Sequence, residues 1–417
     1  MSKIIVKNSG ALQGEIEVSG SKNSALPIIA ACILNEGRNE LSGLPDLSDI
    51  HIMFSLMESL GARIEFASGK TIVNCEHITN YTTPYELVGK MRGSFLLAGP
   101  LLARAGRARI AMPGGCPIGT RPVDLHLKGF AALGADISQG HGYIDLKAKN
   151  KLAGAKIYLD FPSVGATENI LMAAVTALGE TVIENAAVEP EIVDLAEFLN
   201  KQGAQIEGAG TDTVRIAGVR ELKGTAHQII PDRIEAGTFM VAFSATRGTG
   251  RIKNINFSHV KPVAAKLAEM GVEMRCGPDY IDIDAAKKLT TADIKTLPFP
   301  GFPTDMQAPF SVLLSTVEGT GMIVETVFEN RFLHVGELKR MGANIRIDGR
   351  TSVVEGVKRL SGAQVNALDL RGGAALVLAG MVAKGDTQIT GVEHIERGYE
   401  NLVGKLSKIG AKVYSEK

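Results

Sequence analysis

The stretch from Pro113 to His126 combines residue types that could carry out covalent chemistry. It reads Pro-Gly-Gly-Cys-Pro-Ile-Gly-Thr-Arg-Pro-Val-Asp-Leu-His, and its three glycines and three prolines disfavour a helix or a central strand. Cys116 lies five residues before Arg121, and a guanidinium near a thiol lowers the thiol pKa and increases its nucleophilicity. We interpret the stretch as a shaped loop with Cys116 as a candidate nucleophile. A small, inert cysteine in a connecting turn is the alternative.

Charged and polar residues also precede six apolar, alanine-rich segments. Helix N-termini expose unpaired N–H groups and a partial positive charge, and a neighbouring lysine or arginine strengthens their attraction for anions. The residues concerned are Lys22 and Asn23, Arg92, Ser163 with Val164 and Gly165, Asp232 and Arg233, Thr304 and Asp305, and Arg371. Three further arginines, Arg121, Arg331 and Arg397, precede amphipathic segments. Together they predict a site for a doubly anionic small molecule. Asp305 is the exception, because its charge is negative.

Each of these residues also has a purely structural interpretation. Asp305 could be a helix N-cap, a position that aspartate favours. Arg233 could pair with Asp232, and Lys22 and Arg397 could be solvated surface charges. The histidines His126, His259, His334 and His394 have no metal-ligand spacing and are interpreted as structural or supporting residues.

A helical pattern that ends in glycine and is followed by a short alternating strand recurs along the chain. Its six glycines, spaced 68 to 73 residues apart, are Gly61, Gly134, Gly203, Gly271, Gly342 and Gly410. Such regular spacing predicts a repeat of about seventy residues. Each copy is expected to hold an amphipathic helix closed by a C′ glycine.

Between these helices lies a second kind, which is nearly free of charge and therefore expected to be buried on all sides. The copies are Ser24–Leu34, Gly93–Ala105, Ala166–Leu178, Ala236–Ala245, Met306–Thr316 and Gly372–Ala383. Six units divided between two cores of three predict an α/β fold with two similar domains, a crossover near residues 219–231 and a cleft between the domains. A repeat scaffold is the alternative, but the polar capping repeats of a solenoid and the basic surface of a DNA-encircling ring are not seen.

Composition excludes several functional classes. The 417 residues include 45 Lys+Arg and 45 Asp+Glu, so the chain has no net positive charge that would attract nucleic acid or an anionic membrane. The four cysteines are far apart and predict neither a disulfide framework nor a zinc site, which indicates a reducing cytoplasm. The N-terminus has no apolar signal region, and the longest apolar runs are shorter than the ~20 residues of a membrane span. No P-loop or Rossmann glycine motif is present.

The loop around Cys116 closely resembles the cysteine loop of the UDP-N-acetylglucosamine 1-carboxyvinyltransferase family of enolpyruvyl transferases. The resemblance extends over essentially the whole chain, and its other motifs are at residues 20–27, 91–94, 163–169, 302–307, 329–332, 369–373 and 396–399. The sister family that acts on shikimate 3-phosphate shares the six-unit fold. Its pattern lacks this cysteine loop, so the setting of Cys116 favours the first family.

This resemblance implies an inside-out α/β barrel in each of two domains, the first at residues 22–229 and the second formed by residues 1–21 together with 230–417. It implies two small-molecule substrates, phosphoenolpyruvate and UDP-N-acetylglucosamine. Phosphoenolpyruvate is protonated at its methylene carbon, the sugar 3′-hydroxyl adds to the electrophilic centre, and phosphate leaves. We expect no cofactor and no metal. The reaction opens peptidoglycan precursor synthesis in the cytoplasm.

The resemblance also assigns roles to individual residues. Cys116 is the expected proton donor and forms a covalent adduct with phosphoenolpyruvate, and Asp305 orients or deprotonates the sugar hydroxyl. The phosphate and carboxylate of phosphoenolpyruvate are expected on Lys22, Asn23, Arg121 and Arg397, supported by Arg331 and Arg371. The nucleotide sugar is expected on Arg92, Arg121, Pro122, Val123, Asp124, Leu125, Ser163, Val164, Gly165 and the backbone near Val327.

This sequence departs from the family pattern at one position. Some members have a lysine just before the Ser-Val-Gly turn, where this chain reads Asp160-Phe161-Pro162-Ser163. The nucleotide contact that this lysine makes in some family members is therefore not expected in this chain. The oligomeric state is not indicated by the sequence.

Overall fold

The computed structural model describes residues 2–112, 118–119 and 122–416. Cys116 and Arg121 lie outside the described residues, so the expectations placed on them stay predictions. By its internal contacts the chain divides into two compact units, which we call unit 1 and unit 2. Unit 1 consists of Met1–Ser19, Cys116–Thr120 and Pro231–Lys417, and unit 2 of Gly20–Gly115 and Arg121–Ile230. The domain boundaries expected from the resemblance stay a prediction about how the enzyme divides.

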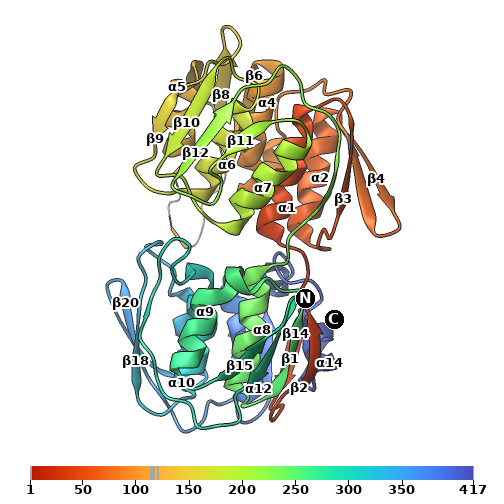
Figure 1. Cartoon of the computed structure of the whole chain (residues 1–417). Coiled ribbons are helices and arrows are strands. Elements are labelled where there is room, and N and C mark those ends of the chain that lie inside the picture. The colour runs from red at the N-terminus through yellow and green to blue at the C-terminus, as the bar shows by residue number, and fades with distance from the viewer. Residues whose placement is uncertain (1, 113–117, 120–121, 417) are drawn as a thin grey trace. The chain divides into compact units, whose positions relative to one another are not determined.

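Unit 2 is built from helices and three small sheets (Figure 1). Its helices are α1 (Lys22–Ala31), η1 (Cys32–Leu34), α2 (Ser48–Leu60), α3 (Tyr85–Val88), η2 (Arg92–Leu97), α4 (Ala98–Ala105), α5 (Asp124–Ala132), α6 (Val164–Ala174) and α7 (Pro190–Lys201). Its strands are β3 (Arg38–Ser42), β4 (Arg63–Ala67), β5 (Lys70–Asn74), β6 (Arg107–Ala111), β7 (Ala135–Gly140), β8 (Tyr143–Ala148), β9 (Lys156–Tyr158), β10 (Glu180–Glu184), β11 (Gln205–Glu207), β12 (Thr213–Ala217) and β13 (Ala226–Gln228). The sheet orders are β13-β3-β5-β4, β6-β8-β7 and β11-β12-β10-β9.

Unit 1 repeats this construction with three four-stranded sheets. Its helices are α8 (Arg233–Ala245), α9 (Phe257–Glu269), η3 (Thr304–Met306), α10 (Gln307–Ser315), α11 (Leu333–Arg340), α12 (Leu370–Val382), α13 (Val392–Ile395) and α14 (Leu402–Lys408). Its strands are β1 (Lys3–Lys7), β2 (Gln13–Glu17), β14 (Thr249–Lys253), β15 (Glu273–Cys276), β16 (Tyr280–Asp284), β17 (Ile294–Lys295), β18 (Thr320–Val324), β19 (Asn344–Asp348), β20 (Thr351–Glu355), β21 (Gln364–Asn366), β22 (Thr387–Thr390) and β23 (Lys412–Glu416). The sheet orders are β15-β16-β14-β2, β17-β18-β20-β19 and β21-β22-β1-β23.

The six predicted repeats are present, one for each sheet. All six repeat glycines have positive φ, from 86° to 109°, and each ends an amphipathic helix as expected of a C′ glycine. The strand after each glycine is an edge strand of its sheet: β4, β7, β11, β15, β19 or β23. The seventy-residue period therefore reports a real structural unit.

The N-terminal strands complete the last repeat of unit 1. β1 pairs antiparallel with both β22 and β23, and β2 pairs in parallel with β14. In Figure 1 the N- and C-terminal ends of the chain lie beside each other at this sheet. The chain therefore begins in the same unit in which it ends, and the first 19 residues belong with the C-terminal half.

The helices that are nearly free of charge form the interior of each unit. In unit 1, α8, α10 and α12 pack on one another, and in unit 2, α6 packs on both α1 and α4. The apolar side chains of each unit form a separate buried core. Because one face of each sheet covers this core, the strands alternate buried and exposed residues, as in β20 and β12. The predicted α/β class, with three repeats and buried helices in each half, is confirmed.

Candidate active site

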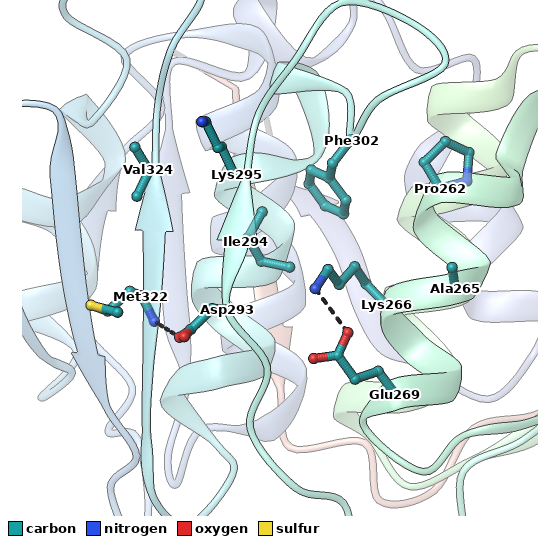
Figure 2. A pocket seen from close by; sticks show the side chains of 10 residues that line it. All are labelled: Pro262, Ala265, Lys266, Glu269, Asp293, Ile294, Lys295, Phe302, Met322 and Val324. Atoms are coloured by element: carbon teal, nitrogen blue, oxygen red, sulfur yellow. Dashed lines mark hydrogen bonds and ion pairs between the residues drawn. The ribbon is translucent and has the colours of Figure 1, made fainter.

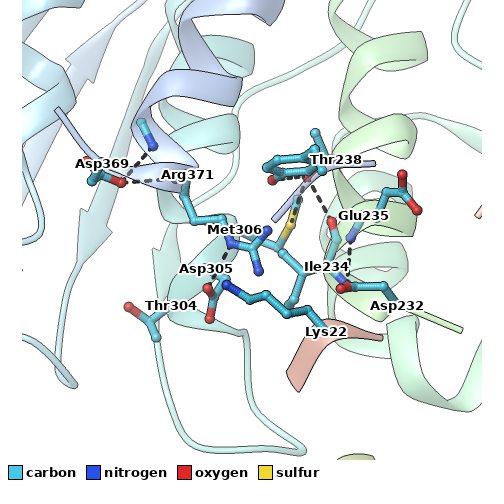
Figure 3. A network of polar contacts seen from close by, with 12 residues as sticks. Lys22, Asp232, Ile234, Glu235, Thr238, Thr304, Asp305, Met306, Asp369 and Arg371 are labelled. Atoms are coloured by element: carbon cyan, nitrogen blue, oxygen red, sulfur yellow. Dashed lines mark hydrogen bonds and ion pairs between the residues drawn. The ribbon is translucent and has the colours of Figure 1, made fainter. Parts of the chain in front are cut away.

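Asp305 is held by two arginines that are distant in sequence. Its Oδ1 accepts a hydrogen bond from Nε of Arg371 at 3.0 Å (Figure 3). It also accepts one from Nη2 of Arg331 at 3.1 Å. The arginine side chains retain only 4% and 8% exposure, whereas that of Asp305 retains 27%. This arrangement pairs two buried cations with one partly exposed carboxylate, all within unit 1.

The arginines control the ionisation of Asp305. Burial favours the neutral carboxyl group, but the charges of Arg331 and Arg371 outweigh burial and hold the pKa of Asp305 well below its ordinary value. Asp305 is therefore a carboxylate at neutral pH. It can accept a hydrogen bond from a hydroxyl group, but it is a weak base in the resting enzyme.

Local structure explains how these side chains converge. Asp305 lies in the single turn η3, directly before the buried helix α10. Arg331 is the second-last residue of the loop that joins β18 to α11. Arg371 is in the first turn of α12, where the Asp369 side chain caps the helix by accepting from the backbone N–H groups of Arg371 and Gly372. A Cβ atom at Gly372 would lie 2.7 Å from the Asp369 carboxylate, so the cap requires glycine there.

The interpretation of Asp305 as only an N-cap is wrong. The position before η3 is Pro303, the position before α10 is Met306, and neither helix has a side-chain cap. The carboxylate of Asp305 points instead to Arg331 and Arg371, and therefore serves the polar cluster rather than its own helix.

Tyr399 and Thr238 extend the cluster behind Arg371. The guanidinium carbon of Arg371 lies 5.1 Å from the centre of the Tyr399 ring, and the Tyr399 hydroxyl is 2.9 Å from Oγ1 of Thr238. Stacking on an aromatic ring stabilises a buried guanidinium and fixes its plane. The sequence assigned this role to neither residue, although Tyr399 lies in the motif at residues 396–399.

Unit 2 holds a second cluster around Lys22. Nζ of Lys22 donates to Oδ2 of Asp49 at 3.0 Å, and the two side chains retain 10% and 3% exposure. Lys22 is the first residue of α1, whose N-cap is Ser21, and Asn23 follows it. The interpretation of Lys22 as a solvated surface charge is therefore wrong. Asp49 was missed because it reads as an ordinary acidic residue in the first turn of α2.

The predicted nucleotide-binding residues of unit 2 gather around the starts of two adjacent helices. Val123 precedes α5 and Asp124 begins it, while Ser163 caps α6 by accepting from the backbone N–H of Ala166. The helices pack against each other. A Cβ atom at Gly165 would lie 3.2 Å from His126 on α5, so glycine permits this close approach. Pro122, Leu125 and Val164 lie in the same two segments.

Arg92 and His126 belong to this group as well. Nη2 of Arg92 donates to the carbonyl oxygen of Pro122 at 3.4 Å. His126 is buried, its Nδ1 is 2.9 Å from the Asn169 amide nitrogen, and its ring contacts Phe95 edge-on. Burial, aided by the charge of Arg92, lowers the pKa of His126 to about 3, so the ring is neutral and supports the loop structurally.

Of the remaining predicted residues, Arg397 and Val327 belong to unit 1. Arg397 is half-buried in the turn that follows α13. The backbone N–H of Val327 donates to Oε1 of Glu325 at 2.8 Å in the loop after β18. Phe161, at the position where some family members have a lysine, is 44% exposed.

A surface groove in unit 1 is lined by none of the predicted residues, although Phe302 on its wall is three residues before Asp305. It has a volume of about 370 Å³ and lies between α9 and the strands β17 and β18 (Figure 2). Its polar side chains are largely engaged, since Lys266 pairs with Glu269 at 2.8 Å and Asp293 accepts from the Met322 N–H. This groove is therefore separate from the predicted site residues.

Within the part of the chain that the structure describes, no group of three or more His, Cys, Asp or Glu side chains could hold a metal ion. None of the described helices is long and apolar enough to cross a membrane.

Comparison with known proteins identifies the class. The family model of EPSP synthase (3-phosphoshikimate 1-carboxyvinyltransferase) matches residues 6–406, and the chain belongs to this family of enolpyruvyl transferases. Within it, the chain is similar to UDP-N-acetylglucosamine 1-carboxyvinyltransferase 1 of Caldanaerobacter subterraneus, with 57% identity over 413 residues and 99% of both chains covered. It is 54% identical to UDP-N-acetylglucosamine 1-carboxyvinyltransferase 2 of Carboxydothermus hydrogenoformans over 415 residues, again with 99% of both covered.

Solved structures agree on the fold. The enolpyruvyl transferase NikO from Streptomyces tendae superposes with a TM-score of 0.89 at 25% identity, covering 99% of this chain and 98% of NikO. EPSP synthase from Acinetobacter baumannii superposes with a TM-score of 0.77 at 19% identity over 100% of both chains, which supports the fold alone.

Proposed function

We propose that this chain transfers the enolpyruvyl group of phosphoenolpyruvate to the 3′-hydroxyl of UDP-N-acetylglucosamine and releases phosphate. The methylene carbon of phosphoenolpyruvate gains a proton, and the sugar oxygen bonds to the neighbouring carbon and loses its proton. Phosphate then leaves with the electrons of its C–O bond, a methyl proton is lost, and an enol ether remains. Relatives at 57% and 54% identity bear the name of this activity.

The observation that carries the proposal is the pairing of Asp305 with Arg331 and Arg371. A carboxylate with a strongly lowered pKa holds a hydroxyl by accepting its hydrogen bond. It becomes an effective proton acceptor only as the forming C–O bond makes that hydroxyl acidic. The proposed role of Asp305 is therefore to align the 3′-hydroxyl and to receive its proton in the transition state.

The buried arginines suit the anionic substrate. Among the described residues, no acceptor bonds to Nη1 of Arg371, although this nitrogen is buried. An unpaired buried donor costs free energy, and a substrate oxyanion would compensate that cost. Arg371 and Arg331 are the proposed supports for the charge of phosphoenolpyruvate. Lys22, Asn23, Arg121 and Arg397 are its proposed direct ligands.

Cys116 is the proposed proton donor to the methylene carbon and the residue that bonds covalently to phosphoenolpyruvate. This role comes from the motif around it, since the residue lies outside the described part of the chain. The positive charge of Arg121 in the same loop is the physical support, because cations stabilise a thiolate.

The nucleotide sugar is assigned to Arg92, the run from Arg121 to Leu125, Ser163 to Gly165 and the backbone of Val327. Support comes from the adjoining N-termini of α5 and α6, whose unpaired N–H groups favour a diphosphate. Arg92, which contacts Pro122, adds a positive charge at this position.

In the cell, the proposed reaction is the first committed step of peptidoglycan precursor synthesis. The chain is accordingly proposed to act in the cytoplasm and to serve cell-wall biogenesis, cell shape, the cell cycle and cell division. Neither nucleic acid nor membrane is a proposed partner.

Phosphate release is the experiment that tests this function. The chain is incubated with phosphoenolpyruvate and, in parallel, with UDP-N-acetylglucosamine, shikimate 3-phosphate or no acceptor. We expect release only with the nucleotide sugar. Release with shikimate 3-phosphate instead would establish the sister activity, and no release with either acceptor would contradict enolpyruvyl transfer.

A further inference from the structure

Glu325 is a buried carboxylate directly after β18, and its side chain organises the loop that carries Arg331. Its exposure is 1%. Oε1 accepts from the backbone N–H of Val327 at 2.8 Å, from that of Phe328 at 3.2 Å and from the Thr296 hydroxyl at 2.8 Å. The loop therefore folds around the carboxylate with which it begins.

The second oxygen of Glu325 reaches the turn that carries Asp305. Oε2 accepts a hydrogen bond from Oγ1 of Thr304 at 2.7 Å. Oγ1 of Thr304 in turn accepts from Nη1 of Arg331 at 3.0 Å. The other terminal nitrogen of the same guanidinium, Nη2, donates to Asp305. One carboxylate is thus connected to both segments that form the Asp305 site.

Chemistry fixes the direction of every bond in this chain. An ionised carboxylate only accepts and a guanidinium only donates, so the Thr304 hydroxyl must donate to Glu325 and turn its lone pairs to Arg331. The hydroxyl has no freedom to reverse, because its single hydrogen is committed to Glu325. Arg331 is consequently held at two points, by Thr304 and by Asp305.

We propose that Glu325 is a positioning residue for the transfer reaction, acting through Thr304 and Arg331 to fix the orientation of the Asp305 carboxylate. This inference rests on the proposed function. Glu325 is not itself a proposed substrate ligand, although it accepts from the backbone N–H of Val327, so its loss acts on the geometry of neighbouring residues. A small misplacement of a catalytic group can cost up to ~10²-fold in rate.

Substitutions separate this role from general support of the loop. In Glu325→Gln the side-chain carbonyl can still accept from the Val327 and Phe328 N–H groups, but the amide then presents a donor to Thr304. Two donors would face the same hydroxyl oxygen, and its hydrogen would lose its acceptor. Thr304→Val removes the connection while leaving Glu325 and its backbone bonds intact. Thr304→Ser keeps the hydroxyl and is the conservative rescue.

The kinetic test measures kcat and KM for both substrates in these variants. Glu355→Gln, a change at an exposed glutamate at the end of β20 in the same unit, is the matched control. We expect E325Q and T304V each to lower kcat by about 10- to 100-fold with a much smaller change in KM. The double variant should lose no more kcat than the more strongly impaired of the two single variants, because both substitutions break the same connection. T304S and E355Q should retain activity close to that of the unaltered enzyme.

A second readout does not depend on turnover. NMR of protein with ¹⁵N-labelled arginine reports whether the two terminal nitrogens of Arg331, assigned by comparison with Arg331→Lys, are distinct or averaged by rotation. We expect distinct signals in the unaltered protein and in T304S, and averaged signals in E325Q and T304V. Unchanged Arg331 signals in E325Q and T304V, or an unchanged kcat in both, would overturn the positioning role. If the unaltered protein released no phosphate with UDP-N-acetylglucosamine, the proposed function would fail, and the NMR result would still decide whether Glu325 orients Arg331.

Discussion

Oδ1 of Asp305 lies 3.0 Å from Nε of Arg371, although 66 residues separate the two in the chain. The contact joins the turn before α10 to the first turn of α12, and both helices belong to the buried core of unit 1. A rigid interior thus determines the position of a partly exposed carboxylate. The catalytic role proposed for Asp305 depends on this placement and on the charge that it maintains.

Removing the negative charge of Asp305 tests that dependence. Asp305→Asn keeps the shape of the side chain but cannot accept the hydroxyl proton, and it leaves Arg331 and Arg371 without their counter-ion. We expect turnover to fall by ~10²–10⁴-fold, the usual contribution of a general base. Steady-state kinetics beside Asp348→Asn, at an exposed aspartate that ends β19, measure the effect. Near-normal turnover of D305N would leave Asp305 without a catalytic role.

The buried pair of Lys22 and Asp49 predicts an effect on stability. Asp49→Asn preserves volume but removes the charge that compensates Lys22, and breaking a buried ion pair costs about 3 kcal/mol. Urea unfolding should therefore give a lower free energy of unfolding for D49N. Asp46→Asn, three residues earlier in an exposed pair with His51, should change it by less than about 0.5 kcal/mol. Equal decreases in the free energy of unfolding for the two substitutions would show that burial does not make the Lys22–Asp49 pair more important for stability than an exposed pair.

Two buried histidines predict how stability depends on pH. Burial lowers the pKa of His126 to about 3 and that of His334 to about 4, below the ordinary value of 6.5. Because the unfolded chain binds these protons more readily, stability is fully present above pH 6.5. It falls as the pH decreases from there toward 4, by about 1.4 kcal/mol per pH unit for each group.

Variants that retain the hydrogen-bond acceptors isolate this effect. His126→Asn and His334→Gln place carbonyl oxygens near Asn169 and Ser311, the present partners of the two rings. Urea unfolding at pH 7 and pH 5 should show a smaller loss of stability in the double variant than in the unaltered protein. His77→Asn, at an exposed histidine, serves as the control. The same loss in all three proteins would exclude the buried histidines as its cause.

Cysteine reactivity should be selective. Burial raises the pKa of Cys75 to about 12, and burial also raises the pKa values of Cys32 and Cys276. Cys32 and Cys75 are buried as well, so only Cys276 is exposed among these three. An epoxide phosphonate that mimics phosphoenolpyruvate should therefore alkylate Cys116 first, and UDP-N-acetylglucosamine should accelerate the reaction.

Peptide mass mapping after a short exposure measures the labelling of each cysteine. Cys276→Ser is the useful comparison, because among the described residues Cys276 carries the one exposed thiol. Labelling of Cys116 should proceed together with loss of activity. Equal labelling of Cys116 and Cys276, or full activity after Cys116 is labelled, would argue against its catalytic role.

The repeat and the buried helices could be predicted from sequence because both are local patterns. Gly203 follows an amphipathic helix and has a φ of 105°, as a C′ glycine requires. The segment Gly372–Ala383 is apolar on every side, and all of it but its last residue lies in the buried helix α12. In both cases a local property of the residues, the conformational freedom of glycine or the apolar character of a helix, determines the structure directly and can therefore be read from the sequence.

Contacts between distant residues could not be predicted in the same way. Lys22 was expected to bind an anion, but nothing in its neighbourhood indicates Asp49 as its partner. Asp305 fits the pattern of an N-cap as well as that of a catalytic residue, and only the positions of Arg331 and Arg371 separate the two. Glu325 has no motif of its own, since its importance depends on burial and on Thr304. These properties arise from tertiary packing.

The most direct test of enolpyruvyl transfer follows the transferred carbon itself. The chain is incubated with UDP-N-acetylglucosamine and phosphoenolpyruvate labelled with ¹³C at the carbon that bears the phosphate, and the mixture is followed by NMR. We predict a new enol ether carbon signal that correlates with the proton at the sugar 3′ position and increases in step with free phosphate. The absence of this correlation, with phosphoenolpyruvate unchanged or converted only to pyruvate, would contradict the proposed function.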